Sequence, residues 1–127
     1  MLSMFWAEKF NLLDGLVVLR LTCGLFFLPH VIGKFTAPAS IDFFKAANFK
    51  PAATWMYIAG AIEVALTTGL VFDLYTPFVA AVAAFHLLVA AVATYKLNRK
   101  WIWVIGGIEF CVFWMLSCIA LTLLTWR

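Results

Sequence analysis

The sequence predicts an all-α integral membrane protein, a bundle of four transmembrane helices, and two observations support this prediction. First, 66% of the 127 residues are hydrophobic and only 12% are charged, whereas soluble domains usually contain about 25% charged residues. Second, the chain contains four apolar segments, each close to the roughly 20 residues that a helix needs to cross a bilayer. A soluble fold would lack the polar residues to cover its surface, and four spans leave no room for a second large domain.

The four spans are expected at residues 16–35, 54–72, 76–95 and 101–124, and together they form one domain over residues 1–127. Proline, aspartate, asparagine or basic residues border each segment, as is typical of helix ends. Between the second and third spans, residues 73–77 predict a tight turn, because Pro77 is suited to the first turn of a helix.

Two shorter helices are expected to lie along the membrane surface. Residues 1–13 combine Phe5, Trp6 and Phe10 with polar residues, which is typical of an interfacial helix. In the first loop, residues 40–49 carry apolar side chains at helical spacing, and Ser40 is expected to be the N-cap.

The distribution of basic residues predicts the orientation in the membrane. Five of them fall in the first and third loops: Lys45, Lys50, Lys96, Arg99 and Lys100. Only Lys9 and Arg127 lie on the other side. Because cytoplasmic loops carry an excess of Lys and Arg, loops 36–53 and 96–100 are expected in the cytoplasm, with both termini outside. This grouping in two loops does not indicate a nucleic-acid partner.

The three cysteines, Cys23, Cys111 and Cys118, all fall in apolar segments, and none forms a C-x-x-C pair. This pattern argues against a disulfide framework and against a dithiol relay. We expect the thiols to act as small apolar packing groups. No motif with metal-ligand spacing is present, so no metal is expected.

Six ionisable side chains within or near the spans are the candidate functional residues: Arg20, His30, Lys34, Glu63, His86 and Glu109. A charge at mid-bilayer costs at least about 2.5 kcal/mol, so these groups are expected to face one another or water.

Depth suggests which of these groups can meet. The helical rise of about 1.5 Å per residue places Glu109, Glu63 and His86 about 12, 13 and 15 Å from the cytoplasmic ends of their helices. Arg20 and Lys34 share one stripe of the first span. Two cations and two carboxylates would then balance, either as a functional site or as a structural device that fixes helix register.

Three motifs that contain these residues resemble the DoxX family. The segment from Arg20 to Lys34 resembles the Arg, Gly, His and Lys spacing of its first span, residues 60–63 followed by Gly69 resemble its Gly-x-x-Glu segment, and residues 107–109 resemble its Gly-x-Glu pattern. The resemblance implies a four-helix protein of a bacterial or archaeal plasma membrane. It also implies an association with redox enzymes, including quinone-reducing thiosulfate oxidation.

The leading hypothesis is therefore a membrane accessory subunit of a redox system that binds quinone, quinol or a similar lipophilic molecule, without a covalently bound cofactor. Glu63 and Glu109 would exchange protons. Four residues would bind the ligand: Arg20, His30, Lys34 and His86. Because the chain has no evident electron carrier, it would be a non-autonomous subunit of a quinone-linked oxidoreductase and would need a redox partner protein.

The alternative hypothesis is a non-catalytic membrane scaffold or carrier that binds a lipid, a metabolite or a partner membrane protein. Membrane lipids are expected partners in either case, and a homo-oligomer is compatible with the sequence. Proton or ion conduction is less favoured, because the outer ends of the spans are apolar. A haem held by His30 and His86 is disfavoured, because the depths of these two residues differ by about 8 Å.

Overall fold

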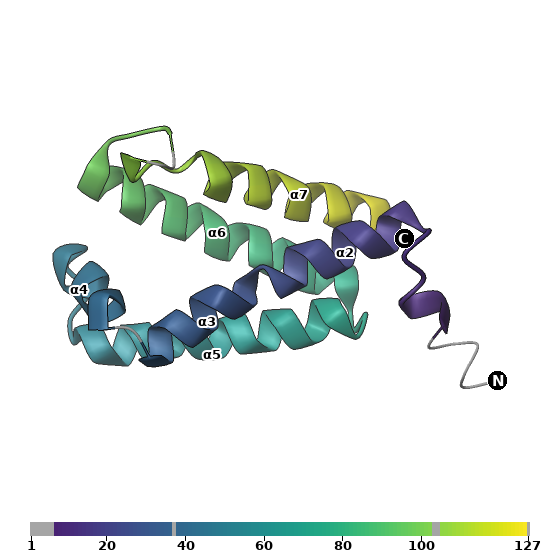
Figure 1. The fold of residues 1–127 in the computed structure, drawn as a ribbon, viewed down its shortest axis with the longest axis horizontal. Helices are drawn as coiled ribbons and strands as arrows, with labels where there is room; N and C mark the ends of the chain where they lie inside the picture. Colours follow the sequence, from purple (N-terminus) through teal and green to yellow (C-terminus); the bar gives the residue numbers. More distant parts are fainter. Residues whose placement is uncertain (1–6, 37, 103–104, 127) are drawn as a thin grey trace.

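The computed structural model describes residues 7–36, 38–102 and 105–126, and within these ranges every regular element is a helix. The helices are α2 (Gly15–Leu25), α3 (Phe27–Thr36), α4 (Pro38–Ala46), α5 (Ala52–Val71), α6 (Thr76–Asn98) and α7 (Glu109–Thr125) (Figure 1). The long helices run side by side as a bundle, and the predicted all-α fold is confirmed.

The lengths of these helices suit a membrane. Gly15–Thr36, Ala52–Val71 and Thr76–Asn98 are long and apolar enough to cross a bilayer, and Glu109–Thr125 is a shorter apolar helix of 17 residues. Seventeen residues are about the minimum for a transmembrane helix. The chain is therefore a multi-pass helical membrane protein.

The first span is divided into α2 and α3 at Phe26. Pro29 follows three residues later. It has no backbone N–H to offer the carbonyl group one turn back, at Leu25, and its ring crowds that carbonyl. The break between α2 and α3 therefore lies where Pro29 disturbs the hydrogen bonds of the helix.

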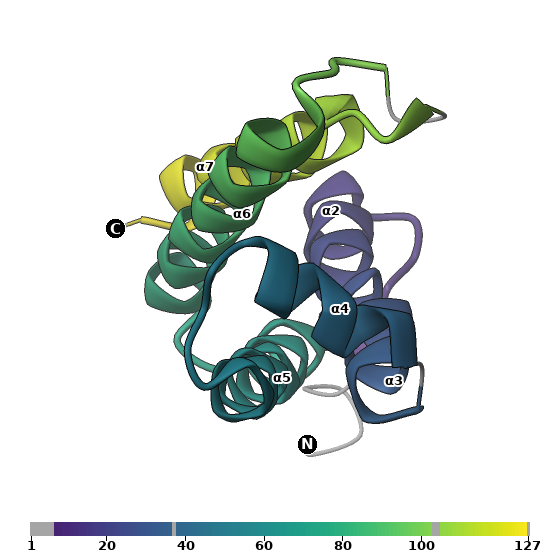
Figure 2. The same cartoon turned by 90° about the vertical axis from the view of Figure 1, so that its left-hand side faces the viewer.

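The helices are arranged as two packed layers. α6 packs along α7, and α5 packs against α2 and α3. α4 and the α6–α7 connection lie at one end of the bundle, here called the loop end, whereas the α5–α6 turn and the two ends of the described chain lie at the other (Figure 1). Seen from the loop end, α4 lies across the ends of the long helices (Figure 2).

The core is formed by small and apolar side chains. On α6, Ala80 and Ala83 are fully buried, so the backbones of neighbouring helices can approach closely. A Cβ atom on Gly24 would lie 2.8 Å from the Cβ atom of Leu70, so α2 and α5 meet at this glycine. Large apolar side chains such as Phe113 and Leu123 of α7 are 75% and 72% exposed, which is expected of a surface that faces lipid.

The fourth span is shorter than predicted. It begins at Glu109 rather than at residue 101, because local hydrogen bonds hold the described residues before it, 101–102 and 105–108, outside the helix. The Asn98 side chain donates to the Gly106 carbonyl oxygen at 2.9 Å, and the Glu109 N–H donates to the Trp101 carbonyl oxygen at 2.9 Å. Arg99 and Gly106 have φ angles of 52° and 90°, which turn the chain out of the helical path.

The two surface helices are partly as expected. α4 confirms a helix in the first loop, but it begins at Pro38 rather than at Ser40. Ser40 is therefore not the N-cap, and its hydroxyl group instead donates to the Gly33 carbonyl oxygen at 3.0 Å. Of the expected helix over residues 1–13, residues 1–6 lie outside the described part, and residues 7–9 are helical.

Candidate functional site

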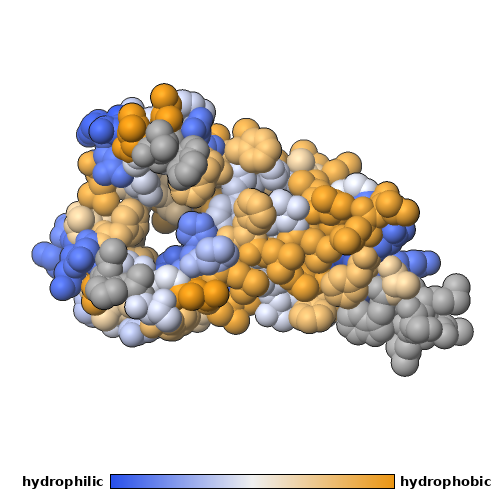
Figure 3. All heavy atoms as spheres, viewed as in Figure 1, coloured by the Kyte–Doolittle hydropathy of each residue, from blue (hydrophilic) through white to orange (hydrophobic). Residues whose placement is uncertain are grey.

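A cavity of about 640 Å³ lies between α3, α5, α6 and α7, on the side that α4 covers. Most of its wall is aliphatic or aromatic. Its polar and thiol side chains are those of His30, Lys34, Ser40, Glu63, His86, Thr94 and Cys111. The space-filling view shows the molecule hollowed toward the loop end, with hydrophilic surface beside the hollow (Figure 3).

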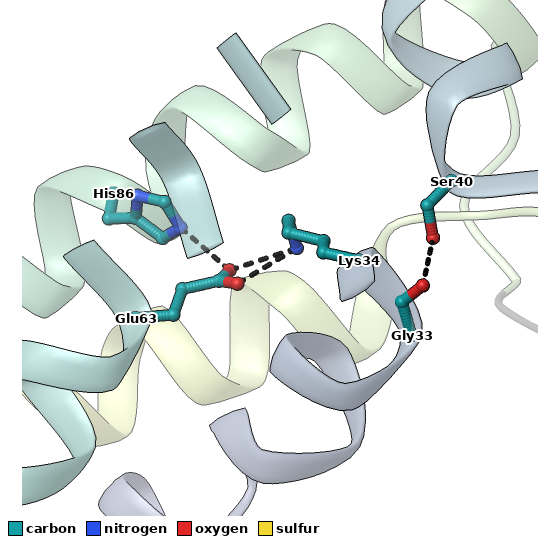
Figure 4. Close-up of polar contacts among 5 residues, drawn as sticks. All are labelled: Gly33, Lys34, Ser40, Glu63 and His86. Atoms are coloured by element: carbon teal, nitrogen blue, oxygen red, sulfur yellow. Dashed lines mark hydrogen bonds and ion pairs between the residues drawn. The ribbon is translucent and has the colours of Figure 1, made fainter. Parts of the chain in front are cut away.

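Three ionisable side chains from three different helices meet in this cavity, and we call them the Glu63 cluster: Lys34, Glu63 and His86. The Lys34 Nζ atom lies 2.8 Å from Oε1 and 3.2 Å from Oε2 of Glu63. The His86 Nε2 atom lies 2.9 Å from Glu63 Oε2 (Figure 4). The exposed fractions of these side chains are only 15%, 6% and 17% for Lys34, Glu63 and His86.

The electrostatics of the cluster follow from this geometry. Removing a carboxylate and an ammonium group from water is costly, and further hydrogen bonds to the ions offset part of that cost. Here His86 supplies a further hydrogen bond to the carboxylate. Because an ionised carboxylate only accepts hydrogen bonds, Nε2 of His86 is then the donor. The cluster thus holds one carboxylate between two hydrogen-bond donors, the ammonium group of Lys34 and the imidazole N–H of His86.

Steric contact between α3 and α5 explains the glycine of the Gly-x-x-Glu segment, Gly60. A Cβ atom on Gly60 would lie 3.1 Å from two ring atoms of Phe35 and 3.8 Å from Cδ of Lys34. The absence of that Cβ atom lets α3 lie close to α5. Glu63 is three residues further along α5, on the same helix face, where the ammonium group of Lys34 reaches it.

His30 faces the same cavity from the preceding turn of α3. Its ring is stacked on Phe110, with centroids 6.4 Å apart and an interplanar angle of 6°, and its centroid lies 5.4 Å from that of Trp114. The ring centroid of Phe27 lies 4.3 Å from that of Trp114 and 6.1 Å from that of His86. One side of the cavity is therefore an aromatic wall next to the Glu63 cluster.

The structure does not bring Arg20 to either glutamate. Its guanidinium group, on a residue that is 3% exposed, donates to the carbonyl oxygens of Leu70 at 2.6 Å, Val71 at 2.7 Å and Lys9. Leu70 and Val71 end α5, and the last carbonyl groups of a helix have no partner within the helix. Arg20 therefore caps α5 at the end of the bundle opposite the loop end.

Glu109 is also separate from the cluster. It is the first residue of α7 and half-buried, and it is not among the residues that line the cavity. The expected depth of about 12 Å is wrong, because the helix that was to carry Glu109 into the membrane begins at Glu109 itself. Its neighbours Phe110 and Cys111 do line the cavity.

Sequence reasoning missed the contribution of α7. Phe110, Cys111 and Trp114 line the cavity, and their spacing of three and four residues places them on one helix face. That spacing was visible in the sequence, but the predicted helix start at residue 101 gave no reason to select this face. In addition, Cys23 and Cys118 are both buried in the hydrophobic core.

The residues present bear on metal binding as well. Over residues 7–36, 38–102 and 105–126, no group of three or more His, Cys, Asp or Glu side chains could hold a metal ion.

Apolar helices that enclose a small ionisable cluster define a compact, multi-pass helical membrane protein. The DoxX family model matches residues 15–96, more than half of the 127-residue chain. The protein therefore belongs to the DoxX family. The matched region contains Lys34, Glu63 and His86 but not α7. Comparison with curated proteins and comparison with solved structures both give no match.

Proposed function

We propose that this protein binds a quinone, a quinol or a similar lipophilic molecule in the cavity beside the Glu63 cluster, as a membrane subunit of a redox system. The observation that carries the proposal is a cavity of about 640 Å³ whose wall is mostly apolar and whose ionisable groups are joined at Glu63. Sites for small lipophilic ligands have this composition, with a few polar groups that fix orientation, and volumes of about 300–1,000 Å³.

The cluster offers the chemistry that such a ligand needs. Lys34 Nζ and His86 Nε2 can donate hydrogen bonds to a ring carbonyl oxygen, and both already lie next to the carboxylate of Glu63. Quinone reduction takes up protons together with electrons. In its protonated form Glu63 can pass a proton to the ring oxygen, and the resulting carboxylate can then regain a proton through the imidazole of His86. We therefore assign proton exchange to Glu63 and His86, in place of the pair Glu63 and Glu109.

The aromatic wall supports the same proposal. A flat ring gains most from offset stacking or edge contacts with aromatic side chains. His30, Phe110 and Trp114 provide such surfaces from α3 and α7, and Trp114 is only 7% exposed. In this proposal His30 orients the ring, whereas Arg20 acts through the fold and does not touch the ligand.

A partner protein would deliver or accept the electrons. In this proposal the described side chains of the cavity wall bind the ligand and exchange protons with it. None of them is given a role in carrying electrons. We place the protein in a bacterial or archaeal plasma membrane as a non-autonomous subunit. The loop end would face the cytoplasm, since Lys45, Lys50, Lys96, Arg99 and Lys100 are all exposed at that end.

Direct binding to the purified protein in lipid nanodiscs tests the proposal. Titration with decyl-tailed benzoquinone should show saturable binding. Glu63→Gln and His86→Leu should each weaken it by about tenfold or more, because Glu63 positions the two donors Lys34 and His86, and a hydrogen bond from an ionised donor such as Lys34 contributes about 1.5–3 kcal/mol. The matched control is Glu8→Gln, since Glu8 is exposed and lies outside the cavity.

The outcomes separate the two functions under consideration. Saturable quinone binding that needs Glu63, together with a redox protein that copurifies from the native membrane, supports a quinone-linked subunit. If the wild-type protein does not bind quinone saturably and instead retains a phospholipid or another lipophile, the protein is a carrier and the redox proposal is wrong.

A further inference from the structure

A second hollow lies beside the cavity, between the α4–α5 segment and the outer face of α6, and we call it the groove. Its volume is about 560 Å³. It is lined by Ala46, Ala47, Phe49, Leu88, Val89, Val92, Ala93, Lys96 and Leu97. With the exception of Lys96, these side chains are all apolar.

The groove and the cavity share part of their walls. Phe49, Val89 and Ala93 line both of them. Val89 is 45% exposed and Ala93 is half-buried, so the boundary runs from the lipid-facing surface of α6 toward the interior. The cavity is therefore bordered by the groove on its lipid-facing side.

The depth of the groove places it among lipid acyl chains. At about 1.5 Å per residue, Leu88 lies about 15 Å from the loop end of α6, and Lys96 lies close to that end. Leu88 and Val92 are 44% and 46% exposed, as expected of side chains that contact lipid. A molecule that passes between the groove and the cavity would thus move within one leaflet of the bilayer.

We propose that the groove holds the hydrocarbon tail of the ligand whose polar ring occupies the cavity. This inference rests on the proposed function and narrows it to a ligand with one polar ring and one long alkyl or prenyl tail. The Glu63 cluster would hold the ring, and the tail would cross the boundary at Val89 and Ala93 and lie along α6. The ligand would enter sideways from the loop-side leaflet.

Two probes that differ only in the tail test this inference: 2,3-dimethoxy-5-methyl-1,4-benzoquinone and its decyl-tailed homologue. Binding to the wild-type protein in nanodiscs is measured for both, with each free concentration corrected for partition into the lipid. The tailed probe should bind more tightly. Val92→Trp, which fills the groove at a residue that does not line the cavity, should remove about tenfold or more of this advantage and leave the tail-less probe unchanged.

Ala81→Trp is the matched control, because Ala81 is an exposed alanine of the same helix that lines neither hollow. If Val92→Trp does not fold, Leu88→Trp obstructs the groove one turn earlier on α6, again at a residue that does not line the cavity. Equal corrected affinities of the two probes for the wild-type protein would overturn the tail site and leave the proposed function intact. Equal weakening of both probes by Val92→Trp would also overturn it. Failure of the wild-type protein to bind either probe would overturn the proposed function as well.

Discussion

The guanidinium group of Arg20 on α2 donates a hydrogen bond to the carbonyl oxygen of Leu70 near the C-terminus of α5, at 2.6 Å. It also donates to the carbonyl oxygen of Val71 at 2.7 Å. Because a buried carbonyl group without a donor costs about 1–3 kcal/mol, Arg20→Met should lower the melting temperature in detergent markedly. Quinone affinity of the folded fraction should change little.

Lys9→Met is the control for this prediction. In the wild-type protein the Lys9 Nζ atom donates to the Phe72 carbonyl oxygen at 3.0 Å in an exposed position. Water can replace this donor in the variant. The loss of stability should therefore be smaller than for Arg20→Met. An Arg20→Met protein with unchanged melting temperature but no ligand binding would show that Arg20 belongs to the site and does not cap α5.

The Lys34–Glu63 pair predicts an asymmetric loss of stability. Glu63→Gln leaves an ammonium group near the end of α3, from which a long side chain can reach water. Lys34→Met leaves a carboxylate that is 6% exposed, with His86 as its partner. Lys34→Met should therefore be the more destabilising change, by up to about 3–5 kcal/mol.

The double variant Lys34→Met/Glu63→Gln completes the thermodynamic cycle for this pair. Because neither charge remains, its loss of stability should be smaller than the sum of the single losses, with a coupling of about 0.5–3 kcal/mol. Thermal unfolding of the four proteins in one detergent measures this coupling. Additive losses would mean that the two side chains do not interact.

Close approach of α2 and α5 predicts a steric effect at Gly24. A Cβ atom there would lie 2.8 Å from that of Leu70, whereas at Gly15 nothing lies within 4 Å of the added atom. Gly24→Ala should lower stability by about 1–3 kcal/mol, as overpacking does. Gly15→Ala should be neutral or slightly stabilising, because alanine favours helix. Equal melting temperatures of the two variants would contradict this packing.

The proposed orientation predicts which side of the membrane a label reaches. Leu13 is 96% exposed at one end of the bundle, and Lys100 is exposed at the loop end. In intact cells, a membrane-impermeant maleimide should modify Leu13→Cys, and it should modify Lys100→Cys only after permeabilisation. The native cysteines are buried, so the wild-type protein serves as the background control. The reverse pattern would invert the topology.

Hydrophobic segment length predicted the bundle well, because a bilayer imposes nearly the same length on every span. Segment length alone could not locate the start of α7. Residues 101–108 are mostly apolar in sequence, yet the hydrogen bond from the Glu109 N–H to the Trp101 carbonyl oxygen, together with the positive φ angle of Gly106, keeps residues 101–102 and 105–108 out of the helix. The residue at which a helix begins depends on hydrogen bonds and backbone angles, which hydropathy does not reveal.

For the candidate site, too, the sequence predicted which residues take part but not which residues they contact. The sequence identified every ionisable member of the Glu63 cluster, because charges within spans are costly and must face inward. It could not identify their partners. Arg20 and Lys34 share one stripe, but the stripe is interrupted where α2 ends and α3 begins. Arg20 meets the carbonyl groups of α5 at one end of the bundle, and Lys34 meets Glu63 nearer the other end.

Photoaffinity labelling with an azido-quinone, mapped by mass spectrometry, tests most directly whether the cavity is the quinone site. Trp114 and Phe113 are neighbours on α7, but Trp114 lines the cavity and Phe113 is 75% exposed to lipid. We predict saturable labelling at Trp114 and Phe110 that excess unlabelled quinone prevents and that Glu63→Gln reduces. Labelling confined to Phe113 and other lipid-facing residues, and unchanged in Glu63→Gln, would contradict the account.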